Sequence, residues 1–432
     1  MLPWFRCSLA VALAVCTVPL SLAQEHPLYG SVKPLPNMIV ETGGAPNNAH
    51  AMKQHYVVLV SLDAFRYDYP EEHGATNMLA LAKEGARANS GMLPSYPSLT
   101  FPNHWTLITG LRPEHHGIVA NGFYDPSRKE QYSYKEDVAN HDGTWYGGVP
   151  LWSLAEQQGM RAATFMWPGS EAEVAGHRPN YYAKFVDHLD GHAGLDQIDA
   201  WLKLPAAQRP HLITFYMPTA DHAGHWYGPD SVEETTAVHT LDALMGELRK
   251  RLDATGLPID LIIVADHGMV RSDTLWIIYD QVAPSLKTAK MVDGQIYAES
   301  DAQAQTIYNE LKAANDPRFS VYWRRNLPAG LKFGANARSG DPVIVMNGAY
   351  IARQHPPAAA AAAPNPGDHG YDPAMIGDMK ALFLANGPDI RKGVSLPVFS
   401  NVDVYDFVAH LLNLKPAPND GELAPLKQAL KK

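Results

Sequence analysis

Carboxylate and imidazole side chains recur in this sequence where apolar runs end. Six of them stand out, five after three such runs and one in a loop rich in glycine and proline: Asp63, Asp221, His225, Asp266, His267 and His369. Each alone has an ordinary explanation, such as a helix cap, a solvated ion pair or a loop histidine. Together they are the oxygen and nitrogen ligands that suit zinc, and burying so much charge without a metal would be costly. We therefore expect two zinc ions in one crevice.

The spacing of these residues supports convergence on a metal. Asp221 and His225 are four residues apart, which places both side chains on one face of a helical turn. Asp266 and His267 are adjacent and would point apart in a straight strand. They can reach one ion if the chain bends at Gly268, which tolerates unusual backbone angles.

Thr100 raises a separate question. The stretch "SLTFPNHWTLITG" reads as a helix start, because Thr100 precedes Pro102 and an apolar run that stops at Gly110. Taken alone, this pattern favours Thr100 as a helix cap. A threonine hydroxyl is a weak nucleophile, but a metal lowers the pKa of a bound oxygen, and the amides of a helix start attract phosphate. Both roles are compatible with this position.

The N-terminus and the overall charge limit where the protein works and what it binds. Residues 1–23 contain Arg6, an uncharged apolar run and a small-residue ending, which predicts a cleaved signal peptide and an exported, periplasmic or secreted protein. A lipid anchor on Cys16 is the second choice, and we expect no transmembrane segment. Cys7 and Cys16 both lie in this segment, so the mature chain would form no disulfide. A formal net charge of −10 argues against nucleic-acid binding.

The rest of the chain predicts an α/β fold. Apolar runs at 56–62, 211–217, 260–265 and 380–385 alternate with helical patterns such as 231–252. This alternation predicts a doubly wound, mostly parallel sheet flanked by helices, which binds ligands at the carboxyl ends of its strands. We expect a loose leader at 24–50, a catalytic domain at 51–415 with an inserted subdomain at about 272–355, a proline- and alanine-rich surface loop near 356–366 and a C-terminal tail at 416–432.

Six motifs, which together span residues 56–414, resemble the nucleotide pyrophosphatase/phosphodiesterase family of the alkaline phosphatase superfamily. They are "SLDAFR", "PSLTFPNHWTLITGLRPEHHGIVAN", "WPGSE", "ADHAGHWYGP", "ADHGM" and "HGYDP". The resemblance implies one zinc on Asp221, His225 and His369, and another on Asp63, Asp266, His267 and the Thr100 oxygen. It also implies that Asn121 contacts phosphate and that Phe101, Tyr182 and Tyr216 form a nucleoside pocket. His104, His115, His116 and His222 match no ligand position, so we expect packing or surface roles for them.

The resemblance also implies an activity. The expected enzyme hydrolyses nucleotide diesters and nucleoside triphosphates to nucleoside monophosphates through a phosphothreonine intermediate. A choline-lipid phosphodiesterase is the nearest alternative. A phosphomonoesterase would need an arginine clamp, for which Arg66 and Arg112 are nearby in sequence, whereas a sulfatase is excluded by a threonine at the nucleophile position. A non-catalytic binding protein would have lost a ligand or Thr100, and neither is lost. The preferred nucleotide and the oligomeric state stay open.

Overall fold

The computed structural model describes residues 30–357 and 364–431. The expected signal peptide at 1–23, with Cys7 and Cys16, lies outside the described residues, as do residues 24–29 of the expected leader and residues 358–363 of the proline- and alanine-rich loop. Among the described residues, no helix combines the length and the apolar character needed to cross a membrane.

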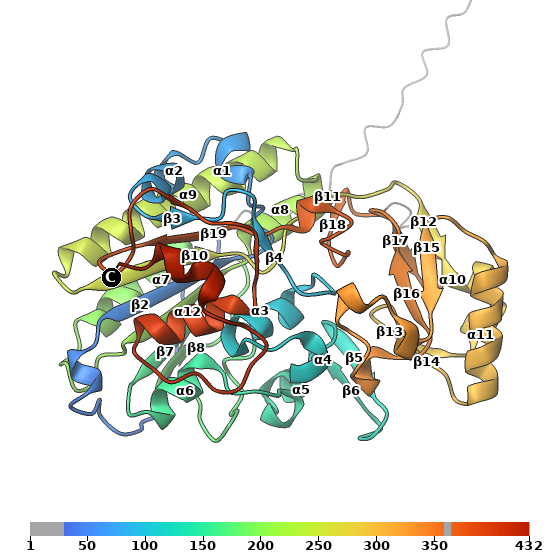
Figure 1. Cartoon of the computed structure of the whole chain (residues 1–432), viewed down its shortest axis with the longest axis horizontal. Coiled ribbons are helices and arrows are strands. Elements are labelled where there is room, and N and C mark those ends of the chain that lie inside the picture. The colour runs from blue at the N-terminus through green and yellow to red at the C-terminus, as the bar shows by residue number, and fades with distance from the viewer. Residues whose placement is uncertain (1–29, 358–363, 432) are drawn as a thin grey trace, which may run out of the picture.

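A nine-stranded sheet forms the centre of the molecule, with the strand order β1-β8-β7-β9-β2-β10-β19-β3-β20 (Figure 1). Its strands are β1 (Ile39–Glu41), β2 (Tyr56–Leu62), β3 (Ala86–Arg87), β7 (Ala162–Phe165), β8 (Tyr181–Ala183), β9 (Leu212–Met217), β10 (Ile259–Val264), β19 (Phe383–Asn386) and β20 (Val394–Ser395). Strands β8, β7, β9, β2 and β10 are parallel to one another. The expected mostly parallel sheet is therefore confirmed.

One apolar run departs from that expectation. The run at 380–385 forms β19, which pairs antiparallel with β10. After β10 the chain passes through the inserted region and returns to the sheet at the carboxyl end of β10, so β19 runs in the opposite direction to β10. A parallel strand would have required the chain to cross back to the amino end of β10 first.

The central strands form because their sequences suit full burial. All residues of β2, "YVVLVSL", are buried, as are those of β9 and β10. Strands covered on both faces read as continuous apolar runs rather than as alternating ones. This is why the runs at 56–62, 211–217 and 260–265 predicted three strands to within one residue.

Helices cover both faces of the sheet. Helix α9 packs against α2, α7 and β10, whereas α12 packs against α3 and β2, which gives two helical layers with the sheet between them (Figure 1). The helices are α1 (Tyr69–Glu72), α2 (Thr76–Lys83), α3 (Thr100–Thr109), α4 (Pro113–His116), α5 (Asp137–His141), α6 (Leu151–Gln157), α7 (Gly191–Leu202), α8 (Thr219–Tyr227), α9 (Val232–Ala254), α10 (Tyr279–Val282), α11 (Asp301–Ala313) and α12 (Asp403–Leu411).

The longest of these helices begins at a capping sequence. The Ser231 hydroxyl accepts a hydrogen bond from the backbone N–H of Glu234, three residues into α9. A serine followed three residues later by glutamate is the pattern of a capping box, which satisfies backbone donors that a helix start leaves free. The helical pattern at 231–252 therefore predicted α9 with small errors at its ends.

The region at 272–355 lies at one end of the molecule (Figure 1) and has an apolar cluster of its own, which includes Ile277, Leu286, Ile307 and Phe319. Outside the main sheet the short strands are β4 (Met92–Leu93), β5 (Gly122–Asp125), β6 (Glu130–Ser133), β11 (Val270–Arg271), β12 (Trp276–Ile278), β13 (Lys290–Val292), β14 (Gln295–Tyr297), β15 (Phe319–Tyr322), β16 (Val343–Met346), β17 (Ile351–Arg353), β18 (Gly367–Asp368) and β21 (Phe399–Ser400). The cluster around Ile277 and Phe319 shows that part of the region 272–355 packs around apolar residues of its own.

The expectation of a loose leader at 24–50 is wrong for its described part. Strand β1 extends the main sheet by pairing with β8, and Asn47 is buried beyond it. The Asn47 side chain donates to the carbonyls of Ala206 and Arg209 and accepts from the N–H of Arg161. Proline, glycine and asparagine indicated irregular backbone, but side-chain hydrogen bonds order that backbone.

The C-terminal segment also packs against the domain. Leu426 and Ala429 are buried, and the Asp420 carboxylate accepts hydrogen bonds from the Arg112 N–H and from the His115 ring. Residues 416–431 therefore form part of the catalytic domain's surface.

We expect Asn47→Ala to lower the free energy of unfolding by about 2–4 kcal/mol, because it leaves buried backbone groups without partners. Chemical denaturation would measure the loss. The control is Asn309→Ala on the exposed face of α11, for which we expect a change within about 0.5 kcal/mol. Equal stability of the two variants would contradict a structural role for Asn47.

Candidate metal centre and active site

The carboxyl ends of three neighbouring parallel strands bring the predicted ligands together. Strands β9, β2 and β10 are adjacent in the sheet. Asp63 follows β2, Asp266 follows β10, and α8, which carries Asp221 and His225, begins two residues after β9. Loops at the carboxyl edge of a parallel sheet meet in one crevice. The topology thus places residues that are more than 200 positions apart at the same end of the sheet, where the parallel strands finish.

The first ligand group consists of Asp221, His225 and His369. The Asp221 Oδ1 atom lies 3.4 Å from the Nε2 atoms of both histidines, and those two Nε2 atoms are 3.1 Å apart. Asp221 and His225 occupy one face of α8, as their spacing of four predicted. His369 comes from the loop after β18.

The second group consists of Asp63, Asp266 and His267. The Nε2 atom of His267 lies 3.0 Å from Asp266 Oδ2 and 3.6 Å from Asp63 Oδ1. Single donor atoms of Asp63, Asp221 and His267 also lie within 4.8 Å of one another, and the rings of His267 and His369 stack at 3.8 Å. The two groups therefore share one crevice.

All three imidazoles are oriented in the same way. Their Nδ1 atoms donate to backbone carbonyls, His225 to Gly367, His267 to Gly268 and His369 to Ser98, over 2.9–3.0 Å. A hydrogen bond from Nδ1 fixes the tautomer in which Nε2 carries the free lone pair. Each ring therefore turns a potential ligand atom into the crevice.

The electrostatics of the crevice call for a cation. Burial and the nearby Asp266 and Asp221 carboxylates raise the pKa of Asp63 well above its usual value. Burial alone would raise the pKa of Asp221, but His225 and His369 bring it well below its usual value. For the same reason Asp221 raises the pKa of His225 to about 9, against the effect of burial. By contrast, burial and the neighbouring His267 ring lower the pKa of His369, so the histidines alone do not balance all the carboxylates.

Unsatisfied oxygens in the crevice also fit a metal. Within the described part of the chain, Asp63 Oδ1, Asp221 Oδ1 and Asp266 Oδ2 are buried and have no hydrogen-bond donor. Such atoms are costly to bury unless a cation contacts them. Three orphaned carboxylate oxygens beside three inward-facing imidazole nitrogens are a donor set for zinc-class ions.

Thr100 is the first residue of α3, and its hydroxyl faces the ligands. Leu99 is the N-cap residue of α3, and its side chain makes no capping hydrogen bond. The Thr100 Oγ1 atom lies 3.4 Å from His267 Nε2. The capping role that the local sequence favours is therefore wrong, although the predicted helix from Thr100 to Gly110 is present. The hydroxyl sits at the amino end of a helix, next to the candidate metal ligands.

His104 connects the start of α3 to Asp266. It is fully buried, and its Nδ1 atom lies 2.9 Å from the Thr100 carbonyl and 3.3 Å from Asp266 Oδ2. Its Nε2 atom lies 2.8 Å from the Ser61 hydroxyl. Both ring nitrogens are thus engaged by the protein, so His104 holds the start of α3 against Asp266.

Asn121 lies next to the start of α3 with its amide oriented. The backbone N–H of Phe101 donates to Asn121 Oδ1 at 2.9 Å. Since an N–H can only donate, this contact fixes the oxygen toward Phe101 and leaves the Asn121 amino group as the donor available to a ligand. The Phe101 ring itself lies 5.1 Å from the Tyr134 ring.

Asp293, which the sequence analysis did not select, positions this loop from the inserted region. Its carboxylate accepts from the N–H groups of Asn121 and Gly122, the latter over 3.1 Å. Asp293 and Gly294 form the tight turn between β13 and β14, and both have positive φ. An Asp-Gly pair between two short apolar segments is a recognised hairpin signal, so the turn was visible in the sequence although its contact with Asn121 was not.

Tyr216 and Tyr182, expected together in a nucleoside pocket, have different environments. The Tyr216 hydroxyl donates to Asp63 Oδ2 at 2.5 Å, so this buried tyrosine supports a candidate metal ligand. Tyr182 lies on β8 near the charges of Glu171 and Arg178. The aromatic side chain near Tyr216 is instead Phe185, with ring centroids 6.3 Å apart and 48% of the Phe185 residue exposed.

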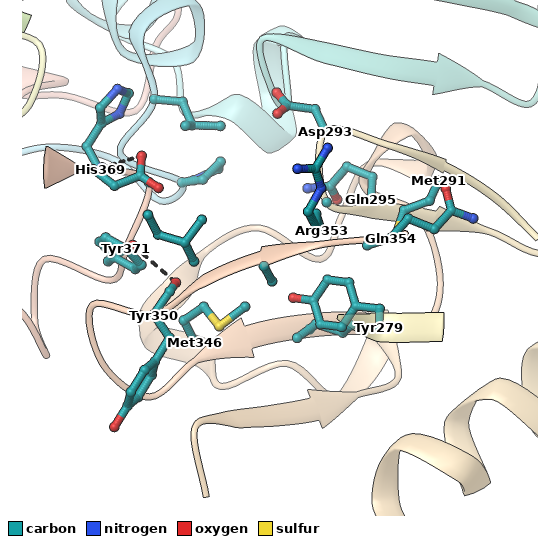
Figure 2. A pocket seen from close by; sticks show the side chains of 18 of the residues that line it. Tyr279, Met291, Asp293, Gln295, Met346, Tyr350, Arg353, Gln354, His369 and Tyr371 are labelled. Atoms are coloured by element: carbon teal, nitrogen blue, oxygen red, sulfur yellow. Dashed lines mark hydrogen bonds between the residues drawn. The ribbon is translucent and has the colours of Figure 1, made fainter. Parts of the chain in front are cut away.

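A cleft of about 390 Å³ opens beside the centre, between the catalytic domain and the inserted region. Figure 2 shows His369 and Tyr371 on one side of this cleft and Asp293, Gln295 and Arg353 on the other. Leu99, the residue before Thr100, also lines it. The cleft therefore reaches the metal ligands and the start of α3 from the side of the insert.

The remaining histidines differ in their environments. His116 is buried, and burial lowers its pKa to about 3, which fits the expected packing role. His115 is exposed and lies 2.7 Å from an Asp420 oxygen, which fits a surface role. His222 lies near Asp187 and His188.

Two comparisons relate the chain to known sequences. The family model for type I phosphodiesterase/nucleotide pyrophosphatase matches residues 57–372. An uncharacterised pyrophosphatase/phosphodiesterase of Schizosaccharomyces pombe is 33% identical over 88% of this chain and 81% of its own length. Human ectonucleotide pyrophosphatase/phosphodiesterase family member 1 is 31% identical over 87% of the chain. A venom phosphodiesterase of Crotalus durissus collilineatus is 32% identical over 90%. The chain spans 42% and 48% of the lengths of these last two relatives.

Solved structures agree with these sequence matches. Murine ectonucleotide pyrophosphatase/phosphodiesterase 5 superimposes with a TM-score of 0.81 at 27% identity, covering 87% of this chain and 100% of that one. An inactive threonine-to-alanine variant of the same murine protein, in complex with AMP, also gives 0.81. These matches confirm the α/β fold and the hydrolase family that the motifs predicted. The chain is a member of the type I phosphodiesterase/nucleotide pyrophosphatase family.

Proposed function

We propose that the protein is an exported two-zinc enzyme that hydrolyses nucleotide diesters and nucleoside triphosphates to nucleoside monophosphates. The observation that carries the proposal is that six ligand side chains share one crevice with the hydroxyl of Thr100, which lies 3.4 Å from His267 Nε2. Relatives named as ectonucleotide and venom enzymes support export, in keeping with the signal sequence, and we place the protein in the periplasm or the medium.

Asp221, His225 and His369 would hold one zinc, and Asp63, Asp266, His267 and the Thr100 oxygen would hold the other. When bound, the ions supply Lewis acidity, which lowers the pKa of the Thr100 hydroxyl and of an attacking water and stabilises charge on the phosphate oxygens. The orphaned oxygens and oriented imidazoles described above support this assignment.

Thr100 acts as the nucleophile. Its oxygen forms a bond to phosphorus while the bond from phosphorus to the leaving oxygen breaks, and the Thr100 proton passes through solvent to that leaving oxygen. Water then attacks the phosphothreonine ester from the opposite direction, and the bond from phosphorus to the Thr100 oxygen breaks. A proton from the water restores the Thr100 hydroxyl as the nucleoside monophosphate leaves. The position of Thr100 at the start of α3 places the positive end of a helix dipole beside the phosphate.

Asn121 stabilises the charge that develops on a non-bridging oxygen. Its amino group is free to donate because its oxygen is held by the Phe101 N–H. Preorganised donors of this kind lower the barrier because they need no reorientation during the reaction. Asp293 is a positioning residue for this step, since it holds the backbone N–H groups of Asn121 and Gly122.

Two features favour a diester over a monoester. The Arg66 guanidinium makes two hydrogen bonds to Asp68 and lies near Glu72 and Asp378, so it is already neutralised and does not serve as a clamp for a dianionic phosphate. The cleft of about 390 Å³ beside His369 provides room for the second half of a diester.

Phe101 and Phe185 are the aromatic residues that we assign to the nucleoside base. Phe185 is half exposed beside Tyr216, whereas Phe101 follows the nucleophile directly. Stacking tolerates any base, so these residues favour nucleotides without selecting one. The AMP complex of the murine relative supports a nucleotide at this crevice.

Release of nitrophenol from three substrates tests the function. We expect kcat/KM for thymidine 5′-monophosphate nitrophenyl ester to exceed that for nitrophenyl phosphate and nitrophenylphosphocholine by at least about tenfold, since base stacking contributes about 1–3 kcal/mol. Fastest turnover of the monoester would contradict a diesterase. Fastest turnover of the phosphocholine ester would instead assign the chain to choline-lipid head groups.

The Thr100→Ala variant tests the nucleophile. We expect it to keep about two zinc ions, because six ligands remain, and to lose at least about a thousandfold in kcat, because no other hydroxyl replaces the missing one. Zinc content by elemental analysis and steady-state kinetics provide the measurements. Thr240→Ala, on the exposed face of α9, serves as the control. A fully active Thr100→Ala enzyme would end the nucleophile assignment.

Phe185→Ala and Tyr182→Ala distinguish the two candidates for the base-binding ring. We expect Phe185→Ala to raise KM for the thymidine ester by about 5- to 100-fold through loss of stacking, and Tyr182→Ala to change it less than about twofold. Bis(nitrophenyl) phosphate, which lacks a base, should be insensitive to both changes. A larger effect at Tyr182 would restore the motif-based expectation.

A further inference from the structure

Another group of possible metal ligands lies outside the proposed two-zinc centre. It consists of Asp187 and His188, in the segment after β8, and His222 on α8. One donor atom of each lies within 4.8 Å of the other two. The side chains are 49%, 15% and 22% exposed, respectively, so the group opens to solvent.

The backbone conformation at His188 brings the side chains of Asp187 and His188, which are adjacent in sequence, close together. Successive side chains of an extended segment point in opposite directions. His188 instead has a φ of 55°, in the left-handed region. This turn brings the His188 Nε2 atom to 3.6 Å from an Asp187 oxygen, while His222 Nδ1 lies 3.8 Å from the other Asp187 oxygen.

The two imidazoles are held by a common aromatic neighbour. Trp226, one turn after His222 on α8, stacks on the His222 ring at 5.1 Å and on the His188 ring at 5.8 Å, with interplanar angles of 27° and 21°. The His188 and His222 rings are themselves 5.4 Å apart. The indole therefore keeps both rings near the Asp187 carboxylate.

We propose that Asp187, His188 and His222 bind a third divalent cation of the zinc class at the rim of the catalytic crevice. Two imidazoles and one carboxylate are a common zinc ligand set, and solvent access leaves the fourth position to water. Tetrahedral zinc with bonds of about 2.0–2.1 Å separates its donors by about 3.4 Å. The two separations from histidine to carboxylate, 3.6 and 3.8 Å to different Asp187 oxygens, are close to that value. Binding requires the segment that contains Asp187 to bring all three donors, now within 4.8 Å of one another, onto one ion.

This site is separate from the two-zinc centre. His222 follows Asp221 directly on α8, and consecutive helical residues point about 100° apart, so their donor atoms serve different ions. The site also lies two residues after Phe185, which we assign to base stacking. A cation bound here fixes the segment that carries Phe185 to α8 and thereby joins the rim of the nucleotide pocket to the helix that holds Asp221 and His225.

Zinc binding by the full-length enzyme tests the proposal without reference to activity. The enzyme is dialysed against micromolar zinc, and bound metal is counted by elemental analysis. We expect about three zinc ions in the wild type and one fewer in His188→Ala and in the nearly isosteric Asp187→Asn, with affinity for the last ion at least about tenfold weaker. Thermal melts show whether each variant is folded, and Asp187→Asn provides the test if His188→Ala unfolds.

The control variant is His192→Ala. His192 is more exposed than His188 and lies 2.9 Å from Asp190, but among the residues that the structure describes no second imidazole completes a ligand group around it. It should keep the full zinc complement. A wild type that binds no more metal than His188→Ala and Asp187→Asn would overturn the proposal, as would loss of an ion in His192→Ala to the same degree. Because the test counts a difference of one ion, it holds even if the two-zinc proposal fails.

Discussion

The repulsion among three buried carboxylates is the constraint on which the rest of this structure depends. Asp63 and Asp266 are buried at the ends of adjacent strands, and the Asp221 carboxylate, which is 13% exposed, meets them from α8. Burial and mutual proximity disfavour their charged forms, and only a positive charge between them makes the arrangement stable. Asp221 and Asp266 raise the pKa of His225 and His267, so these two rings supply part of this charge, whereas burial and His267 lower the pKa of His369. Divalent cations provide the charge when all three histidines are neutral ligands. The crevice is therefore built for metal before any substrate is considered.

The fold meets this constraint with its most rigid parts. Fully buried parallel strands fix the backbone just before Asp63 and Asp266, and a helix that begins at the same edge presents Asp221 and His225. Hydrogen bonds from the three imidazoles end on backbone carbonyls rather than on mobile side chains. Metal sites need this second layer, because a ligand that can rotate binds weakly. Loops contribute mainly His369 and the exposed Phe185 ring.

The inserted region contributes to the crevice although part of it packs around its own apolar cluster. Its Asp293 reaches the loop of Asn121, and its Arg353 lines the cleft beside His369. Other residues of the region, among them Phe333 and Val345, join the main core, and Arg338 pairs with Asp125. The region is therefore anchored to the rest of the molecule, which holds its contacts at the crevice in place.

The strands at 56–62, 211–217 and 260–265, the helix at 231–252 and the family were predictable from the sequence alone, because continuous apolar runs, helical periodicity and motifs are local signals. The candidate ligand residues also come from the sequence, and the metals that they would bind stay a prediction. The sequence also predicted the helix at Thr100. The capping role that the local pattern favoured is wrong, because Thr100 is the first residue of α3 and its hydroxyl contacts His267, which is distant in the chain. Only the tertiary structure decided that β19 is antiparallel, that Asn47 anchors the leader, that Phe185 rather than Tyr182 lies beside Tyr216, and that Asp293 supports Asn121. Each of these depends on contacts between segments distant in the chain, which no local pattern encodes.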